Sequence, residues 1–315
     1  MNEISRIRKG EFVRSVAGFR NWVTKDGSAG PTGEAGFKAE AGRYHLYVSH
    51  ACPWANRTLI FRELKGLKEV ISVSVVHPLL ESQGWSFDAY PEATGDQVNG
   101  FSYLREAYAA SADAYHGSIT VPVLWDKQQQ TIVSNESSEI IRMLNSAFDD
   151  YANSDVDYYP ESLRNEIDEI NDLVYENVNN GVYRAGFATT QLAYERAFDR
   201  LFNALDELEQ RLSSRRYLVG DQITEADWRL FTTLIRFDSV YYNHFKTNKK
   251  RLIDYPNLWA YTRELYQVPG VAETVNMDHI KYHYFASHRS INPTGIVPKG
   301  PDIDFLIPHG RDNVK

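Results

Sequence analysis

The arrangement of apolar and polar residues changes near residue 43. Residues 1–42 are rich in Gly, Ser, Thr and charge and follow no period, so we expect an irregular N-terminal extension. Beyond it, residues 44–48 form a short apolar run, residues 53–65 a helical pattern and residues 70–76 an alternating run. A strand, a helix and a strand in this order predict two parallel strands joined by a helical crossover.

A polar insertion at residues 77–118 separates this unit from a second apolar block. Residues 119–126 and 131–133 predict two further strands joined by a short turn. The first of them contains a proline, which a central strand does not accommodate unless the backbone there is unusual. A cis Val121–Pro122 bond at the end of the strand would be such a feature.

Two predicted helices begin at recognisable caps. Ser134 or Asn135 can cap a helix that extends through Met143. Thr224 can cap another, and Asp227 stands three residues later, where its carboxylate can bond back to the cap. These signals place the start of each helix on the sequence.

From residue 160 the pattern is helical. Apolar residues recur at spacings of three and four in two long segments, which we interpret as helix faces turned to a core. Pro and Gly recur from Ile291 onward and predict an extended tail over 291–315. The residues of the two apolar faces are Leu163, Ile167, Ile170, Val174 and Val178, and Phe198, Leu201, Leu205, Leu208 and Leu212.

Composition narrows the class of protein. A chain of 315 residues suggests two domains. The formal charge of −8, from 34 basic and 42 acidic residues, argues against nucleic acid as a partner. The sequence shows neither a secretory h-region nor an apolar run of ~20 residues, so we expect no membrane partner. A single cysteine excludes an internal disulfide, which fits a cytoplasmic location.

That cysteine, Cys52, stands between the strand at 44–48 and a helix that starts with Pro53. Proline is favoured in the first helical turn, so the thiol lies at or just before the helix N-terminus. Unpaired N–H groups and the helix dipole favour the thiolate there, and such positions lower a cysteine pKa from ~8.5 to as little as ~3.5. A buried structural cysteine is the alternative. The strand–Cys–Pro–helix order favours a nucleophile, and any mixed disulfide on Cys52 needs an external thiol to release it.

Other constellations carry less information. His279, His283 and His288 lie close in sequence, but no convergent further ligand is evident and we expect no metal site. His50 is two residues from Cys52 and is interpreted as pocket lining. The chain has no Gly-x-Ser-x-Gly elbow, no P-loop and no Gly-x-Gly-x-x-Gly after a strand.

The motifs together resemble a known family. The Cys52-Pro53 turn, the Val-Pro entry to a hairpin and a Glu-Ser helix start resemble the thioredoxin-like domain of cytosolic glutathione transferases, and a helical domain follows. Cys-Pro-Trp-Ala at 52–55, Trp85 in its insertion, Asn-Asn-Gly-Val-Tyr at 179–183 and Asn-Pro-Thr-Gly at 292–295 narrow the resemblance to the glutathionyl-hydroquinone reductases, or Xi class.

The resemblance covers essentially the whole chain and implies an α/β plus all-α fold. A thioredoxin-like glutathione-binding domain is expected at 43–150 and an all-helical glutathione-transferase domain at 160–290. It also implies a homodimer formed through the helical domain, glutathione as co-substrate and no metal.

A glutathione site follows from the same resemblance. The backbone N–H and C=O of Val121 would pair with the cysteinyl part of glutathione, as an added strand would; a simple edge-strand proline is the alternative. Ser137 at a helix N-terminus suits the γ-glutamyl carboxylate, and Glu136 suits its ammonium group. Plain helix capping by this segment is compatible with binding. Some relatives carry an arginine before the Val-Pro strand that is absent here; either the affinity for glutathione is lower, or Arg105 or another cation compensates.

Aromatic residues complete the implied site. Trp85 would pack beside glutathione and the substrate ring, with a loop anchor as the alternative. Pro53 and Trp54 would shape the pocket floor. Tyr183 and Tyr284 of the helical domain would contact the hydroquinone oxygens, since a phenol can donate or accept a hydrogen bond.

The implied reaction is a glutathione-dependent reduction. Cys52 attacks the sulfur of a glutathionyl-hydroquinone, the hydroquinone leaves, and a second glutathione resolves the Cys52–glutathione disulfide to glutathione disulfide. One alternative is an omega-like thioltransferase, or deglutathionylase, with the same nucleophile and a wider pocket. Another is a non-catalytic glutathione-transferase-like interaction module, in which Cys52 is dispensable.

Overall fold

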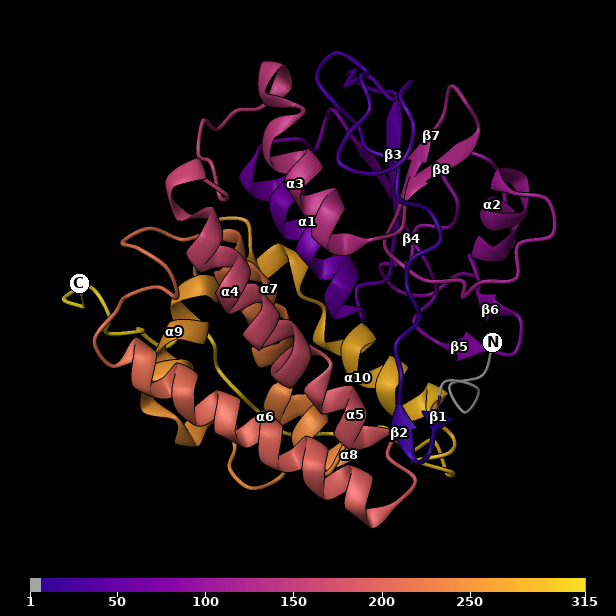
Figure 1. Cartoon of the computed structure of the whole chain (residues 1–315). Coiled ribbons are helices and arrows are strands. Elements are labelled where there is room, and N and C mark those ends of the chain that lie inside the picture. Colours follow the sequence, from indigo (N-terminus) through magenta and orange to yellow (C-terminus); the bar gives the residue numbers. More distant parts are fainter. Residues whose placement is uncertain (1–6, 315) are drawn as a thin grey trace. The chain divides into compact units, whose positions relative to one another are not determined.

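The computed structural model describes residues 7–314 (Figure 1). Its residues form two units. The first consists of residues 15–157 and 273–283, and the second of residues 7–14, 158–272 and 284–314.

A four-stranded sheet forms the centre of the first unit. The inner strand β3 (Tyr44–Val48) is buried along its whole length. It pairs parallel with β4 (Ser72–Val75) and antiparallel with β7 (Val123–Asp126), and the crossover helix α1 (Pro53–Leu64) follows it in the chain. The predicted strand–helix–strand unit is thereby confirmed, and the strand at 44–48 was predicted with its correct bounds. The strands follow the order β4, β3, β7 and β8 (Thr131–Ser134).

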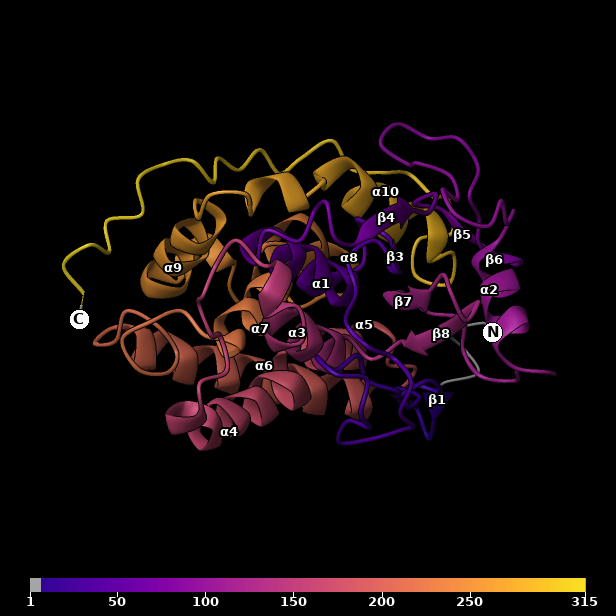
Figure 2. The same cartoon turned by 90° about the horizontal axis from the view of Figure 1, so that it is seen from above.

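Helices cover both faces of this sheet. Helices α1 and α3 (Ser137–Ser146) lie side by side on one face, and α2 (Leu104–Ser111) lies on the other (Figures 1 and 2). Helix α2 belongs to the polar insertion, where we predicted no element, as does the small hairpin of β5 (Leu80–Glu81) and β6 (Gly84–Trp85). Such short elements bury too few apolar residues to leave a periodic pattern in the sequence.

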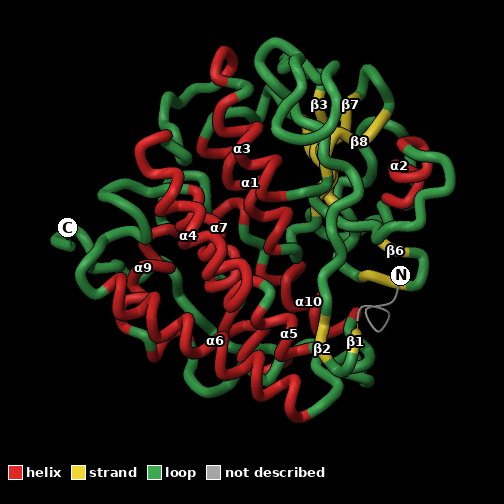
Figure 3. The backbone as a smooth tube through the Cα atoms, viewed as in Figure 1, coloured by secondary structure: helices red, strands yellow, loops and turns green. Residues whose placement is uncertain are grey.

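The N-terminal extension follows the edge of the sheet as a loop (Figure 3). The Asn21 amide donates to the Val133 carbonyl at 3.0 Å, and the Arg20 guanidinium binds Glu139 through two hydrogen bonds, one of 2.8 Å from Nε. An irregular segment thus covers strand β8, whose edge would otherwise expose unpaired backbone groups.

The second unit is mainly helical. Its longest helix, α6, packs on α5 and α9, and α4 packs on α7. The predicted cap of α7 is confirmed, because the Thr224 amide donates to the buried Asp227 carboxylate at 2.7 Å. Among the described residues, no helix has the length and apolar content to cross a membrane. The helices are α4 (Arg164–Val174), α5 (Gly181–Gly186), α6 (Gln191–Leu212), α7 (Glu225–Leu234), α8 (Tyr242–His244) and α9 (Pro256–Tyr266).

Short elements complete the description of both units. Two π-helical turns, Tyr175–Asn179 and Phe237–Tyr241, stand before α5 and α8. Helix α10 contributes residues 277–283 to the first unit and 284–287 to the second. The remaining elements are β1 (Ile7–Arg8), β2 (Glu11–Phe12), α10 (Met277–Ser287) and the 3-10 turns Asp149–Tyr151, Glu161–Leu163, Leu252–Asp254 and Ala272–Thr274.

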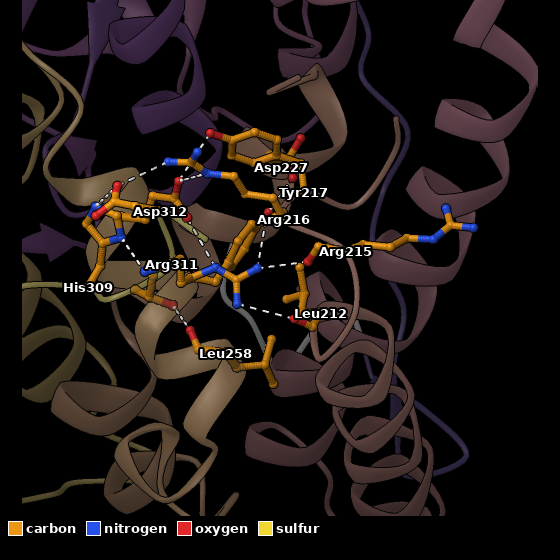
Figure 4. Close-up of polar contacts among 12 residues, drawn as sticks. Leu212, Arg215, Arg216, Tyr217, Asp227, Leu258, His309, Arg311 and Asp312 are labelled. Carbon is orange, nitrogen blue, oxygen red and sulfur yellow. Dashed lines mark hydrogen bonds and ion pairs between the residues drawn. The ribbon is translucent and has the colours of Figure 1, made fainter. Parts of the chain in front are cut away.

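The C-terminal tail contains no regular helix or strand over residues 288–314 and is anchored to the second unit by Arg311 (Figure 4). Arg311 is 2% exposed, and its guanidinium donates to the carbonyl oxygens of Arg215 and Arg216 at 2.9 and 2.8 Å. Its Nε donates to the Glu264 carboxylate at 3.1 Å. Because the Arg311 side chain is buried and its bond to the Glu264 carboxylate is charge-assisted, the tail is an integral part of the helical unit rather than a loose end.

Candidate active site

Cys52 stands where the first unit turns from β3 into α1. It is the N-cap residue of α1, with extended backbone angles and Pro53 in the first turn. Its amide donates to the Ser49 carbonyl at 3.1 Å, and its own carbonyl accepts from the Asn56 amide at 3.0 Å. The side chain is partly exposed. The thiol therefore lies at the positive end of a helix and within reach of solvent, as a nucleophile requires.

The segment before β7 faces this thiol. The Val121–Pro122 peptide bond is cis, as predicted, and strand β7 starts only at Val123. The Cys52 Sγ atom lies 3.5 Å from the carbonyl oxygen of Val121, which is 5% exposed. The predicted nucleophile and the predicted backbone contact for glutathione are thus direct neighbours.

Helix α3 begins one or two residues later than we expected. The predicted caps, Ser134 and Asn135, are wrong: the N-cap is Glu136, whose Oε1 accepts from the Ser138 amide at 3.0 Å. Ser134 instead accepts from the Glu136 amide at 3.2 Å, and the Asn135 side chain accepts from the Phe19 amide at 3.1 Å. Because the Asn135 side chain is hydrogen-bonded to the N-terminal extension, Glu136 caps the helix instead.

Ser137 is the first residue of α3 and is 3% exposed. A helix N-terminus with a serine hydroxyl and backbone N–H groups is suited to a carboxylate. A cation that the sequence analysis missed lies beside it. The guanidinium of Arg57, 1% exposed, has Nη1 3.4 Å from the Ser137 Oγ atom and its Cζ atom 4.6 Å from the centre of the Trp54 ring.

Arg57 therefore connects two predicted site segments, the helix after Cys52 and the start of α3. The expected substitute cation, Arg105, lies over the Tyr103 ring at 4.8 Å and binds the Gln83 side chain. Nothing in the sequence pointed to Arg57, because the apolar pattern of a helix predicts which apolar residues are buried and does not reveal a single buried charged residue.

Trp85, in the hairpin of the insertion, is buried at 6% exposure. Its indole stacks on the imidazole of His283, with 5.0 Å between ring centres and 26° between planes. Trp85 is therefore anchored within the first unit. Its contact with glutathione remains a prediction.

The second unit contains a cluster of tyrosine hydroxyls. Tyr183 from α5 and Tyr284 from α10 are hydrogen-bonded with 2.5 Å between their oxygens, so the two predicted tyrosines are brought together. The hydroxyl of Tyr241, which the sequence did not single out among 20 tyrosines, lies 3.0 Å from that of Tyr284. Burial raises the pKa of Tyr284 well above its ordinary value, and the neighbouring Tyr183 and Tyr241 raise it further. Tyr284 therefore stays protonated and can donate a hydrogen bond.

A cation accompanies this cluster. The Arg14 Cζ atom lies 4.9 Å from the centre of the Tyr183 ring, and its Nε donates to the Asn180 side chain at 2.6 Å. A guanidinium over an aromatic face is attracted by the ring quadrupole. The residues just after β2 thus help to fix the Tyr183 ring.

The histidines do not form a metal site in the part of the chain that the structure describes. No group of three or more His, Cys, Asp or Glu side chains in residues 7–314 is arranged to hold a metal ion. His279 and His283 bind backbone carbonyls instead, and His288 contacts His244 with 3.1 Å between ring nitrogens.

A sheet of this topology with a cysteine at a helix N-terminus, a cis-proline turn facing it and a helical unit after it is the arrangement of a glutathione transferase. Two family models match the chain accordingly. Residues 51–147 match the model described as "Glutathione S-transferase, N-terminal domain", and residues 191–264 match "Glutathione S-transferase, C-terminal domain".

Relatives of known name extend the likeness to nearly the whole chain. Glutathionyl-hydroquinone reductase YqjG of Escherichia coli K12 is 58% identical over 304 residues, covering 96% of this chain and 93% of that protein. Its glutathione-bound structure superposes with a TM-score of 0.92 and covers 94% of this chain and 96% of the other. Glutathionyl-hydroquinone reductase PcpF of Sphingobium chlorophenolicum is 53% identical, covering 93% of this chain and 90% of that protein.

A Xi-class glutathione transferase structure from Natrialba magadii is 52% identical, with a TM-score of 0.90, and the match covers 93% of this chain and 88% of that one. The chain therefore belongs to the glutathione transferases, in the Xi-class family of the glutathionyl-hydroquinone reductases. The predicted fold class, a thioredoxin-like domain followed by an all-helical one, is confirmed.

Proposed function

We propose that this enzyme reduces glutathionyl-hydroquinones to hydroquinones with glutathione as co-substrate. The observation that carries the proposal is the position of Cys52, at the N-terminus of α1 and 3.5 Å from the Val121 carbonyl. The names of the relatives YqjG and PcpF, both glutathionyl-hydroquinone reductases, support the substrate class. The glutathione-bound structure of YqjG supports glutathione as the molecule bound beside Cys52.

The first step is attack of the Cys52 thiolate on the sulfur of the glutathionyl-hydroquinone. A disulfide forms between Cys52 and glutathione, the bond between sulfur and the aromatic carbon breaks, and that carbon takes up a proton. Tyr183 and Tyr284 bind the hydroquinone oxygens in this proposal. The raised pKa of Tyr284 supports its part, because a protonated phenol can donate to an oxygen that gains charge as the ring accepts electrons.

The second step follows from the presence of one cysteine. No second thiol in the chain can resolve the mixed disulfide, so the thiolate of another glutathione attacks it. Glutathione disulfide leaves and Cys52 returns as a thiolate. Two glutathionyl groups thus supply the two electrons that reduce the carbon–sulfur bond, and the kinetics are ping-pong.

Glutathione binds along the first unit in this proposal. Its cysteinyl part pairs with the backbone of Val121, its γ-glutamyl carboxylate binds at Ser137, and its ammonium group binds Glu136. The burial of Ser137 at a helix N-terminus supports the carboxylate position, and the buried Arg57 guanidinium beside it adds positive charge. Pro53, Trp54 and Trp85 form apolar walls.

The assembly and compartment belong to the same proposal. The chain forms a homodimer through its helical unit and works in the cytoplasm, where glutathione is kept reduced. Light scattering of the purified chain at micromolar concentration tests the first part, and a mass near 36.1 kDa would contradict it.

The reaction itself is tested by release of free hydroquinone from a glutathionyl-hydroquinone plus glutathione. Wild type and Cys52→Ala are compared by chromatography, and glutathione on Cys52 is measured by intact mass. We expect rapid release by the wild type and none by the variant. A wild type that releases no hydroquinone yet carries glutathione on Cys52 would instead indicate a thioltransferase acting on mixed disulfides. Full activity in Cys52→Ala would exclude the proposed nucleophile.

A further inference from the structure

Residues 77–92, the insertion loop that carries Trp85, are bound at both ends to one helical segment of the first unit. The His283 imidazole lies with Nδ1 2.9 Å from the Pro78 carbonyl oxygen, near the start of the loop. The His279 imidazole lies with Nε2 2.6 Å from the Pro91 carbonyl oxygen, near its end. Both carbonyls can only accept, so each of these ring nitrogens carries a proton and donates it.

Further contacts fasten the same loop to the same segment. The Asn276 side-chain amide donates to the Glu92 carboxylate at 2.6 Å. The Tyr90 and Tyr282 rings are stacked with 5.2 Å between their centres and 24° between planes.

Trp85 lies between the two fastened ends. The loop places its indole against the His283 ring, 5.0 Å from centre to centre, and leaves it only 6% exposed. His283 therefore has two functions in the geometry: its N–H fixes the backbone at Pro78, and its ring fixes the plane of the indole. Stacked aromatic pairs gain stabilisation beyond their buried area, which makes the orientation specific.

The same helical segment also reaches the turn before the nucleophile. The rings of His279 and His50 are 5.3 Å apart and nearly perpendicular, and His50 precedes Cys52 by two residues. The Asn56 side-chain amide of α1 donates to the Thr274 carbonyl at 3.0 Å. Residues 273–283 thus contact both the Cys52 turn and the Trp85 loop.

We propose that His279 and His283 are positioning residues that hold the Trp85 loop in one register against the Cys52 turn and so set the affinity for the glutathionylated substrate. The proposal rests on the proposed function in that Trp85 contacts this substrate. Neither histidine touches the reacting atoms in it. Their effect is to keep the indole pre-oriented, which lowers the ordering cost of binding.

Four variants separate the parts of this arrangement. His283→Phe keeps a ring beside Trp85 and removes the donor, whereas His283→Asn keeps a donor near the Nδ1 position and removes the ring. His279→Leu removes the donor to Pro91, and His279→Gln returns one near the Nε2 position. His116→Asn, at an exposed site in the same unit, is the matched control.

Steady-state kinetics with a glutathionyl-hydroquinone give the first readout. We expect His283→Phe and His279→Leu to raise KM about three- to tenfold, the effect of one lost hydrogen bond, with kcat changed less than about twofold. His279→Gln should restore most of the affinity, and His283→Asn only part, because it lacks the stacked ring. Unchanged KM in all four variants would overturn the proposal, as would a fall in kcat alone.

Amide hydrogen exchange in the free protein gives a readout that does not depend on the reaction. The His77 amide donates to the Ser86 carbonyl at 2.9 Å and the Phe87 amide to the Ser102 carbonyl at 2.9 Å, and both belong to the loop region. We expect faster exchange at these amides in His279→Leu and His283→Phe and unchanged exchange in β3. Faster exchange with unchanged KM in these variants would mean that the two histidines hold the Trp85 loop but do not affect substrate binding. Unchanged exchange would show that they do not hold the loop, even if the wild type reduces its substrate.

Discussion

The Cys52 thiol lies 3.5 Å from the carbonyl oxygen of Val121, although 69 positions separate the two residues in sequence. One belongs to the N-terminus of α1 and the other to the turn before β7. This is the arrangement that the proposed function needs, because glutathione paired with the Val121 backbone would lie next to the proposed nucleophile.

This relationship predicts a change of reaction in Cys52→Ser. A serine hydroxyl at a helix N-terminus cannot form a disulfide with glutathione but can hydrogen-bond a glutathione thiolate bound beside Val121. We expect hydroquinone release to fall by about 10³-fold or more, with measurable conjugation of glutathione to 1-chloro-2,4-dinitrobenzene in its place. Spectrophotometry of the conjugate and chromatography of hydroquinone measure the two activities. Loss of both would mean that serine does not stabilise the bound thiolate.

The buried Arg57 guanidinium predicts a defect in glutathione binding. It contacts the Ser137 hydroxyl and the Trp54 ring through a planar group that lysine cannot reproduce. We expect Arg57→Lys to raise the KM for glutathione about three- to tenfold at a constant concentration of the aromatic substrate. Arg105→Lys, on an exposed side chain that contacts Tyr103 and Gln83, is the matched variant and should leave this KM within about twofold. Equal effects of Arg57→Lys and Arg105→Lys on this KM would show that Arg57 has no special part in glutathione binding.

The tyrosine cluster predicts that Tyr284 matters more than its partners. Its hydroxyl stands between those of Tyr183 and Tyr241, and burial keeps it protonated through neutral pH by raising its pKa. We expect Tyr284→Phe to lower kcat/KM for hydroquinone release by about 10²-fold, as removal of a donor from a buried network does. Tyr241→Phe should cost less, because Tyr284 then keeps Tyr183 as a partner. Tyr242→Phe serves as control, and a loss in it equal to that in Tyr284→Phe would contradict the assignment.

The sequence was sufficient for those features that short-range patterns encode. The strand at 44–48, the helix start at Pro53 and the capping box of Thr224 and Asp227 each depend on residues within a few positions of one another. The position of the Cys52 thiol could be predicted for the same reason, whereas its role as nucleophile stays a prediction. Strand, turn, Cys52 and helix are consecutive, so the local sequence alone places the thiol at a helix N-terminus.

Features made by distant residues could not be predicted in this way. The Trp85 stack on His283 joins positions 198 residues apart, and no period or motif signals it. The cap of α3 moved to Glu136 because Asn135 is occupied by the backbone of Phe19, more than a hundred residues earlier. Tyr241 likewise acquires its partner only through the fold. Long-range contacts of this kind decide the details of the site, while local patterns decide its position.

Buried neutral histidine in the sheet predicts a loss of stability in acid. His45 is fully buried in β3 between the hydroxyls of Ser72 and Ser74, at 2.7 and 2.9 Å, and burial lowers its pKa to about 4. In the unfolded chain His45 takes up a proton near pH 6.5, whereas in the folded chain it does so only near pH 4. Between these pH values the unfolded state therefore binds more protons, and lowering the pH stabilises it relative to the folded state. The free energy of unfolding should fall by about 1.4 kcal/mol per pH unit from this group between pH 6.5 and 4.

Urea unfolding of wild type and His45→Gln at several pH values measures this contribution. Glutamine can bond either serine but does not titrate, so the variant should show a shallower decline below pH 6.5 whatever its stability at pH 7.5. His116→Gln, at an exposed position, should follow the wild-type curve. Parallel curves for wild type and His45→Gln would show that His45 protonates equally in both states.

The anchor of the C-terminal tail predicts a large effect at a site far along the sequence from Cys52. Arg311 donates to two backbone carbonyls (Figure 4) and is buried against the Glu264 carboxylate. Glu264 also accepts from Arg216 Nε at 2.7 Å. Removing one partner of a buried ion pair leaves the other charge without compensation, which costs about 3–5 kcal/mol. We expect Arg311→Ala to lower the free energy of unfolding by roughly this amount, less the share that Arg216 still neutralises.

Asp312→Asn is the control for this prediction. Its carboxylate lies 3.6 Å from Arg216 but is 78% exposed, so the ion pair is screened and should contribute within ~0.5 kcal/mol. Chemical denaturation of the full chain compares the two variants, and the double change Arg311→Met with Glu264→Gln tests the cause. If the cost arises from the uncompensated Glu264 charge, the double variant should be more stable than Arg311→Met alone. If the double variant is less stable, the tail is held by the geometry of the hydrogen bonds to Arg215 and Arg216 instead.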